Sequence, residues 1–164
     1  MAFEPPPLGT AYQPRHAQSL PRGQPVTPDM ELQRAVRLAL IAAPGVAEHI
    51  TPERIRAGIA RPENVPVIIM TPASVDILGH ASGGQKVVEI TMKLHVWTDG
   101  GQADTAQQIA SAAMLALMDK PQIAACTIEE WDRPAMVWVP DPDPALSFSH
   151  AVIALRGVIY WRAS

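Results

Sequence analysis

The chain has 164 residues, 48% hydrophobic and 18% charged, which is enough for one domain with a buried core and too little for two comfortable ones. Its formal net charge of -3 provides no overall attraction to nucleic acid, whose binding proteins usually carry a basic face. The single cysteine, Cys126, excludes an intrachain disulfide and hence a disulfide-stapled secreted domain. No apolar run approaches the ~18 to 20 residues of a membrane helix, and no signal peptide opens the sequence, so we expect a soluble protein made in the cytoplasm.

Residues 1–28 hold seven of the 17 prolines, with little apolar content between them. Such a segment buries too little surface to offset the entropy cost of ordering it. We therefore predict an extended proline-rich arm, followed by a single domain at 29–164. We expect a neighbouring chain to hold the arm; the alternative is that the arm folds back on its own domain.

The first half of the domain predicts one helix and one short strand. Asp29 is placed to cap a helix, which carries apolar residues at helical spacing until Pro44 and Gly45 end it. Residues 51–59 indicate a helical turn, 65–72 a short strand between prolines, and 79–86 a turn or hairpin loop.

The second half contains the clearest pattern, because residues 86–97 alternate between apolar and polar side chains. We predict a half-buried antiparallel strand there, a helix at 102–120, and one bent strand or two short ones, broken at Pro134, within 123–140. A stiff loop at 140–144 and a long strand at 149–162 follow. The fold class is α+β: an antiparallel sheet with two main helices on one face, in the order helix-strand-strand-helix-strand-strand.

The glycines at 100 and 101 stand between the long strand and the second helix, where a phosphate-binding loop often lies. A P-loop needs a lysine and a hydroxyl residue directly after its glycines, and a dinucleotide fingerprint needs a third glycine at fixed spacing. Neither is present. We interpret the pair as a corner, with Thr98, Asp99 or Asp104 available to cap the helix or tie down its approach.

The sequence predicts no catalytic, metal-binding or cofactor-binding residues. The five histidines are scattered without the spacing of a metal motif. His95 and His150 fall on the two long strands and are placed to face each other, which favours a polar sheet face over a metal site. Glu129 and Glu130 point to opposite faces of a strand, and Cys126 has no basic neighbour in the sequence to stabilise a thiolate.

Four tryptophans fall in or at the ends of predicted strands, where some belong to the core and others to an interface. Only Trp161 clearly shares its face with an apolar stripe. The candidate interface residues are Arg15, Arg22, Trp97, Asp99, Trp131 and Trp138.

Five segments, covering about residues 30–162, resemble the tail-completion family of long-tailed bacteriophages and phage-derived gene transfer agents. They are "ELQRAVRLALIAAPGV", "VPVIIM", "LHVWTDGG", "ADTAQQIASAAMLALMD" and "ALRGVIYWR". The resemblance implies a structural virion protein without enzymatic activity, located in the tail or neck and assembled in the host bacterial cytoplasm. It implies a tail terminator: a homo-hexameric ring that caps the head-proximal end of the tail tube and joins it to the neck and capsid.

The partners implied by the resemblance are the tail tube protein and a neck or head-completion (stopper) protein, with no membrane. DNA passes through the channel of such a ring without specific binding, and the net negative charge is compatible with that. Two alternatives remain open on the residues alone: a small ferredoxin-like binding module, and a small hydrolase that uses His95 or His150.

Overall fold

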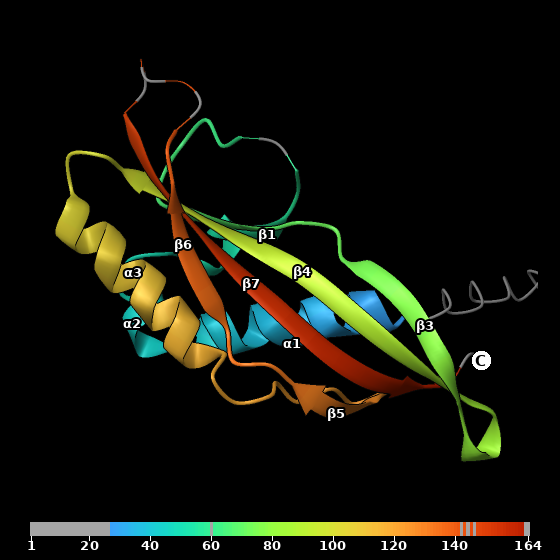
Figure 1. Cartoon of the computed structure of the whole chain (residues 1–164). Helices are drawn as coiled ribbons and strands as arrows, with labels where there is room; N and C mark the ends of the chain where they lie inside the picture. The colour runs from blue at the N-terminus through green and yellow to red at the C-terminus, as the bar shows by residue number, and fades with distance from the viewer. Residues whose placement is uncertain (1–26, 60, 142, 144, 146, 163–164) are drawn as a thin grey trace, which may run out of the picture.

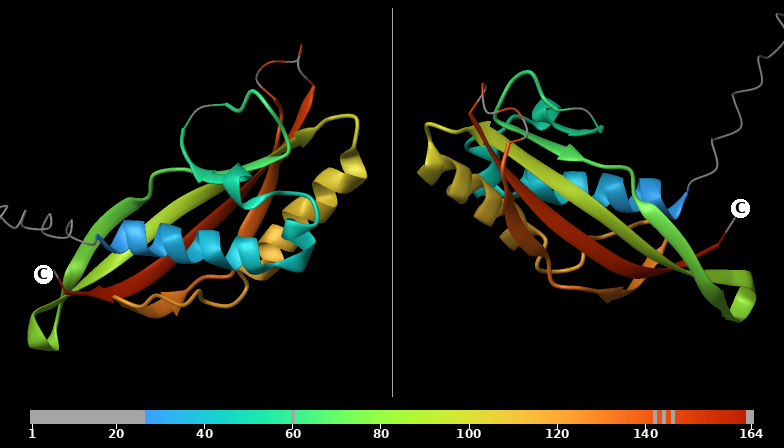
Figure 2. Two further views of the ribbon diagram at one scale, coloured as in Figure 1. Left: turned by 180° about the vertical axis from the view of Figure 1, so that it is seen from behind. Right: turned by 45° about the horizontal axis from the view of Figure 1, so that its top comes forward.

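A seven-stranded sheet forms the centre of the molecule, and its helices lie on one face (Figure 1). In this computed structural model the described residues are 27–59, 61–141, 143, 145 and 147–162. The helices are α1 (Pro28–Ala42), α2 (Pro44–Ala47) and α3 (Ala103–Ala116), with 3-10 turns at Pro52–Arg54 and Ser82–Gly84. Seen from behind, α1 and α3 lie in front of the strands (Figure 2). No helix in the described part of the chain is long and apolar enough to cross a membrane.

The strands are β1 (Ile55–Ala57), β2 (Val67–Met70), β3 (Ser74–Ala81), β4 (Gln85–Asp99), β5 (Thr127–Trp131), β6 (Ala135–Val139) and β7 (Phe148–Trp161). The central antiparallel pair is β4 and β7, in register from Lys86 opposite Trp161 to Asp99 opposite Phe148. Along the other side of β4, β3 pairs with its first half and β2 with its last part. Along the other side of β7, β6 pairs with its first part and β5 with its last. β1 adds a parallel strand beside β2, so the sheet is mixed and the predicted α+β class is confirmed.

The core lies between the sheet and the helices, as the alternation of the long strands predicts. Its largest contribution comes from one face of the central pair, whose buried residues are Val88, Ile90, Met92, Leu94, Val96, Ala151, Ile153, Leu155 and Ile159. α1 packs Leu32, Val36 and Leu40 against them, and α3 packs Ile109, Ala113 and Leu117. Among the described residues, no helix lies on the opposite face of β4 and β7, and we call it the open face (Figure 1).

Helix α1 begins without the side-chain cap that the sequence predicts. Thr27, not Asp29, stands at the N-cap position, and its side chain makes no capping hydrogen bond. Pro28 occupies the first turn, where its missing N–H costs nothing. Asp29 and Glu31 lie in the same turn, where a negative charge is favourable beside the helix dipole. Asp29 therefore acts on the helix through its charge.

The double glycine forms the predicted corner between β4 and α3. The N–H of Gly100 donates to the carbonyl oxygen of Ser147 at 2.7 Å, which brings the start of β7 against the end of β4. A Cβ atom on Gly100 would collide with that carbonyl, so close approach requires glycine here. Asp99 ties down the next turn by accepting a hydrogen bond from the Gly101 N–H at 2.9 Å.

The sequence analysis did not predict two edge strands, β1 and β3. β3 ends within the segment predicted as a loop, and its side chains are mostly exposed. Its alternation is limited to Val75, Asp76 and Ile77, because Leu78 and Gly79 interrupt it where the pairing with β4 shifts register. β1 has three residues and follows the helical turn at Pro52–Arg54. Of the two possibilities for 123–140, two short strands are correct: β5 and β6 are separated by Asp132, Arg133 and Pro134.

Candidate interaction surface

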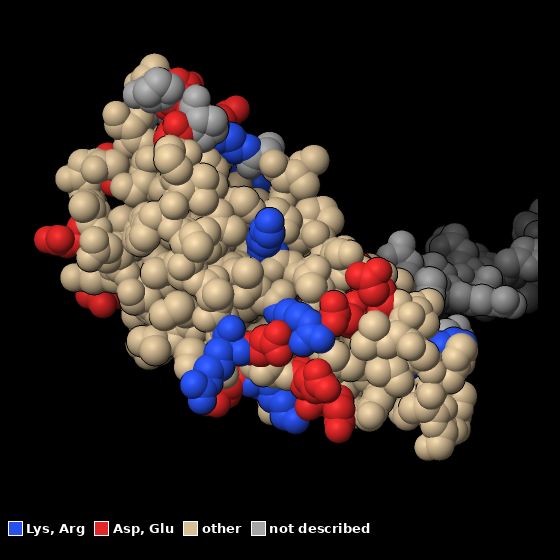
Figure 3. All heavy atoms as spheres, in the orientation of Figure 1, with Lys and Arg blue, Asp and Glu red and all other residues tan. Residues whose placement is uncertain are grey.

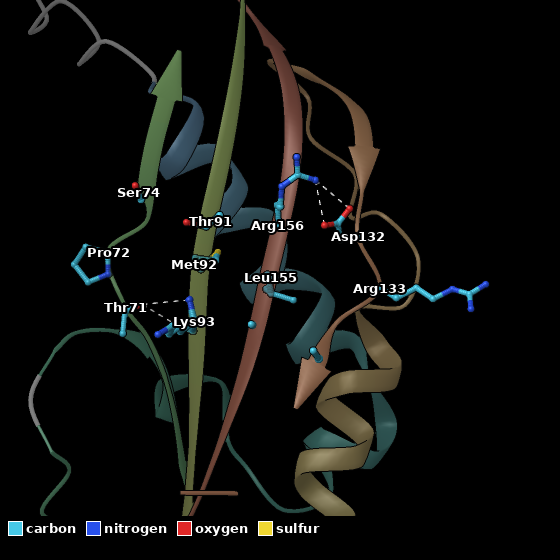
Figure 4. A pocket seen from close by; sticks show the side chains of 12 residues that line it. Thr71, Pro72, Ser74, Thr91, Met92, Lys93, Asp132, Arg133, Leu155 and Arg156 are labelled. Carbon is cyan, nitrogen blue, oxygen red and sulfur yellow. Dashed lines mark hydrogen bonds and ion pairs between the residues drawn. The ribbon is translucent and has the colours of Figure 1, made fainter. Parts of the chain in front are cut away.

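Charge is unevenly distributed over the open face. In the orientation of Figure 1, acidic and basic side chains gather over the lower middle of the molecule, and the surface around β6 carries few charges (Figure 3). A hollow of about 430 Å³ lies across the central pair, where β2 gives way to β3 on one side and β5 to β6 on the other. Thr71, Lys93 and Arg156 line it, and Arg133 points away from it (Figure 4).

Arg156 is the centre of the charged area. Its Nε donates to Oε2 of Glu89 at 2.9 Å, and its Nη1 lies 3.1 Å from Oδ2 of Asp132. These hydrogen bonds, which Arg156 donates to Glu89 and to Asp132, raise the pKa of the guanidinium, and the bond to Glu89 has the larger effect. Arg156 thus joins β7 to β4 and to the segment between β5 and β6. Its charge is already matched by carboxylates, so it offers little to an anionic ligand.

Three aromatic rings form a stack on the open face, on the two central strands β4 and β7. The Trp97 ring lies parallel to that of His150 with centroids 3.7 Å apart, and the His150 ring stacks on His95 with centroids 5.0 Å apart. Nδ1 of His95 is 2.8 Å from Nε2 of His150. Trp97 and His150 are buried, with 5% and 6% of their surfaces exposed.

The two histidines are held neutral by their surroundings. Burial lowers the pKa of His150 to about 4, and the charge of His95 acts in the same direction. Burial, followed by the nearby Lys93 charge, also lowers the pKa of His95. Near pH 7 one neutral ring donates to the other. The remaining Nδ1 of His150 has no hydrogen-bond partner among the described residues.

Arg61 packs against this ring stack. Its guanidinium lies 5.6 Å from the centroid of Trp97 and 4.7 Å from that of Phe148, and its Nε donates to Oδ1 of Asp141 at 3.2 Å. The hydrogen bond from Arg61 is the main cause that lowers the pKa of Asp141. Arg61 thus connects the loop before β2 to the loop before β7. A second hollow of about 400 Å³, mostly apolar, lies beside it between Ile59 and Val139.

The arrangement does not form a recognisable catalytic or metal centre. Within the described residues, no three His, Cys, Asp or Glu side chains are grouped to hold a metal ion. Burial raises the pKa of the Cys126 thiol, which keeps it protonated. Glu129 and Glu130 stand at an irregularity in the pairing of β5, and both are exposed.

Residues 34–160 match the family model described as "Tail completion protein gp17". The chain belongs to this family. It is therefore a structural component of a phage-type tail. No curated protein matches the tail-completion chain significantly.

The fold of this tail-completion chain also matches a solved structure. That structure is titled "Virion of native gene transfer agent (GTA) particle", and the matched chain is 18% identical with a TM-score of 0.57. The match covers 79% of the tail-completion chain and 94% of the other. At this identity the match shows a common fold.

The structure distributes the candidate interface residues over several places. Arg15 and Arg22 lie outside the described residues. Trp97 is buried in the ring stack, and Trp131 donates its indole N–H to the carbonyl oxygen of Leu117 at 2.9 Å. Trp138, on β6, is 45% exposed, and Asp99 is exposed at the corner. Among these, Trp138 has the largest apolar surface available to a partner.

Sequence reasoning identified the His95 and His150 pair but missed Arg61, Asp141 and Arg156. The pairing of His95 with His150 follows from alternation, since both fall on the polar side of long strands. Arg61 and Asp141 are 80 residues apart in loops, where no periodicity applies. The sequence contains one indication of the role of Arg156. It is a charged residue in the middle of the closing strand, on the face opposite the apolar stripe, where a charge favours an opposite charge on a neighbouring strand.

Proposed function

We propose that the chain is a tail terminator: a homo-hexameric ring that caps the head-proximal end of the tail tube and joins it to the neck and capsid. The observation that carries this proposal is the family match over residues 34–160. Its partners are then the tail tube protein and a neck or head-completion protein, and DNA passes through its channel without specific binding. In this role the chain works without catalysis, as part of the virion.

The surfaces of the fold suit assembly. Apolar side chains remain exposed on two strands, Val75, Ile77 and Leu78 on β3 and Val137, Trp138 and Val139 on β6. Exposed apolar residues concentrated on sheet edges are typical of protein–protein contacts. We assign contact roles to Trp138 and Asp99 in the domain and to Arg15 and Arg22 in the arm. Trp97 and Trp131 support the surfaces around them.

The arm is proposed to lie across an adjacent subunit or a neck protein. Because α1 begins at Pro28 with Thr27 at its N-cap, the arm is best removed as residues 1–26. Particles assembled with this truncated chain should show weakened joining of heads to tails. Assembly at the normal yield would contradict the role of the arm while leaving the ring untouched.

The terminator role is tested by electron microscopy of particles made without this gene. Overlong tails, unattached to heads, are the expected result, because nothing then stops tube growth. Unattached tails of normal length would instead indicate a joining role without termination. Normal attached tails would contradict both. Complementation with a His95→Gln, His150→Gln double variant should restore particles if the two imidazoles have no catalytic task.

A further inference from the structure

The free edges of the sheet differ in how well they are protected. At the edge strand β1, the Ile55 carbonyl oxygen accepts a hydrogen bond from Nε of Arg37 at 2.7 Å. On β5, the Ile128 carbonyl oxygen accepts one from Nζ of Lys120 at 3.1 Å. β5 also carries Glu129 and Glu130, and charges discourage pairing with another strand. These two edges are blunted.

Within the described residues, no side chain donates a hydrogen bond to a backbone carbonyl oxygen of β3 or β6. β6, with the sequence Ala-Met-Val-Trp-Val, contains no charged residue, and β3 contains one, Asp76. In the described part of the chain, β3 pairs with β4 alone and β6 with β7 alone. Each therefore presents a row of backbone donors and acceptors together with exposed apolar side chains. A further strand is the partner that this chemistry fits.

The two edges lie on opposite sides of one sheet, which makes them suitable for each other. β3 flanks β4, and β6 flanks β7 on the far side. If a second copy continues the sheet of the first in the same orientation, each of its strands runs in the same direction as the equivalent strand of the first copy. β3 and β7 run antiparallel to β4, and β6 runs antiparallel to β7. The β6 strand of one copy therefore meets the β3 strand of the next in the antiparallel sense, as a regular ladder requires.

The exposed apolar side chains also fall on matching faces. Val75 and Ile77 stand opposite Ile90 and Val88 of β4, which are buried beneath the helices. Trp138 stands opposite the buried Ala151 of β7. All three thus lie on the helix-covered side, with exposed fractions of 40%, 65% and 45% respectively. Joining the edges places Trp138 of one copy beside Val75 and Ile77 of the next and removes their apolar surfaces from water.

We propose that successive copies of this chain join head to tail by pairing β6 of one copy with β3 of the next. This inference rests on the proposed ring and names its subunit contact. The contact is heterologous, so repeating it generates a ring when the rotation closes. β3 and β6 flank opposite halves of the central pair, so neighbouring copies are staggered along the strands. A closed sheet accommodates that stagger by inclining its strands to the ring axis.

Thiol cross-linking in assembled particles tests this contact. Replacing Cys126, the free cysteine of the described part, by serine leaves only the introduced thiols. A chain with both Val75→Cys and Trp138→Cys, treated with a short bismaleimide, should give a ladder of cross-linked oligomers. Each single variant should give none. A matched control combines Val75→Cys with Leu115→Cys on α3, where 65% of the side chain is exposed, and should also give no ladder.

Two outcomes overturn the contact. Dimers from the Trp138→Cys single variant would mean that β6 meets β6. Absence of cross-links in particles that contain the double variant and have normal attached tails would mean that the ring uses other surfaces. This second outcome would leave the terminator role untouched. That role is tested by a different result, namely normal attached tails on particles made without the gene.

A second variant tests the same contact without chemical modification. Val137 lies in the middle of β6 and is 58% exposed, so Val137→Lys adds a charge to the edge without disturbing the core. We expect it to reduce the yield of joined particles at least about tenfold, whereas Leu115→Lys does not. Equal yields from the two lysine variants would contradict the proposal.

Discussion

His95 and His150 share one hydrogen bond between Nδ1 and Nε2, 2.8 Å apart, on adjacent central strands of the open face. The ring of Trp97 stacks on His150, and Trp97 is buried together with Val67 and Ile69 of the neighbouring strand β2. A buried imidazole that stays neutral in the folded state makes stability depend on pH.

The sign of that dependence follows from the lowered pKa. His150 has a pKa of about 4 when folded, below the ordinary value of 6.5, so between these values the unfolded chain binds more protons. The free energy of unfolding should therefore fall as the pH drops from 6.5 to 4, by up to about 3 kcal/mol. His95, with its pKa also lowered, acts in the same direction. The stability that ionised Asp141 contributes is lost only at lower pH, as the pH falls below the ordinary aspartate pKa, because the pKa of Asp141 in the folded chain is lowered.

Denaturant unfolding of wild type and His150→Phe at several pH values measures this effect. The phenylalanine retains the stacking and removes the titrating group, so its stability should fall less steeply over the same range. Identical slopes for wild type and His150→Phe would contradict the account.

Gly100 and Gly101 should respond differently to the same substitution. Gly100→Ala places a methyl group against the carbonyl oxygen of Ser147 and should cost about 1–3 kcal/mol of stability. Gly101→Ala meets only the Asp99 side chain at 3.4 Å, an ordinary contact distance, and serves as the control. Thermal or denaturant unfolding measures both. A Gly100→Ala variant as stable as Gly101→Ala would mean that the corner does not need this close approach.

The sequence places both Trp131 and Trp138 among the candidate interface residues, but in the structure Trp131 makes a hydrogen bond within the chain and Trp138 is exposed. Trp131→Phe removes the donor to the Leu117 carbonyl oxygen and should destabilise the isolated chain by about 1–2 kcal/mol. Trp138→Phe, at a 45% exposed position, should change the stability of the isolated chain little. Equal losses in unfolding experiments would contradict this distinction.

Arg61 should not tolerate replacement by lysine. A lysine keeps the charge but loses both the stacking on Trp97 and Phe148 and the paired geometry toward Asp141. We expect Arg61→Lys to lower the denaturation midpoint, while Arg56→Lys, at an exposed position of β1, leaves it unchanged. If both variants unfold at the wild-type midpoint, Arg61 does not hold the two loops together.

The central architecture was predictable because two physical patterns are strong in the sequence. Alternation fixes which side chains of β4 and β7 face the helices, and it also brings His95 and His150 onto one face. The edges were harder to predict because the apolar alternation of β3 covers only Val75, Asp76 and Ile77 before Leu78 and Gly79 interrupt it, which is too short a pattern to separate a strand from a loop. The contacts of Arg61 and Arg156 depend on loops and neighbouring strands that meet only in the folded chain.

The family resemblance rested on element order and was confirmed by the match over residues 34–160. The ring, its copy number and its position remain proposals. They depend on surfaces whose partners belong to other chains, and a single sequence contains no direct record of them.

Imaging the junction of head and tail in intact particles by electron cryomicroscopy tests the central claim most directly. The account predicts a sixfold ring of this fold between the last tube ring and the neck, with β6 of each copy against β3 of the next. A junction without this fold, or this fold found elsewhere in the particle, would contradict it.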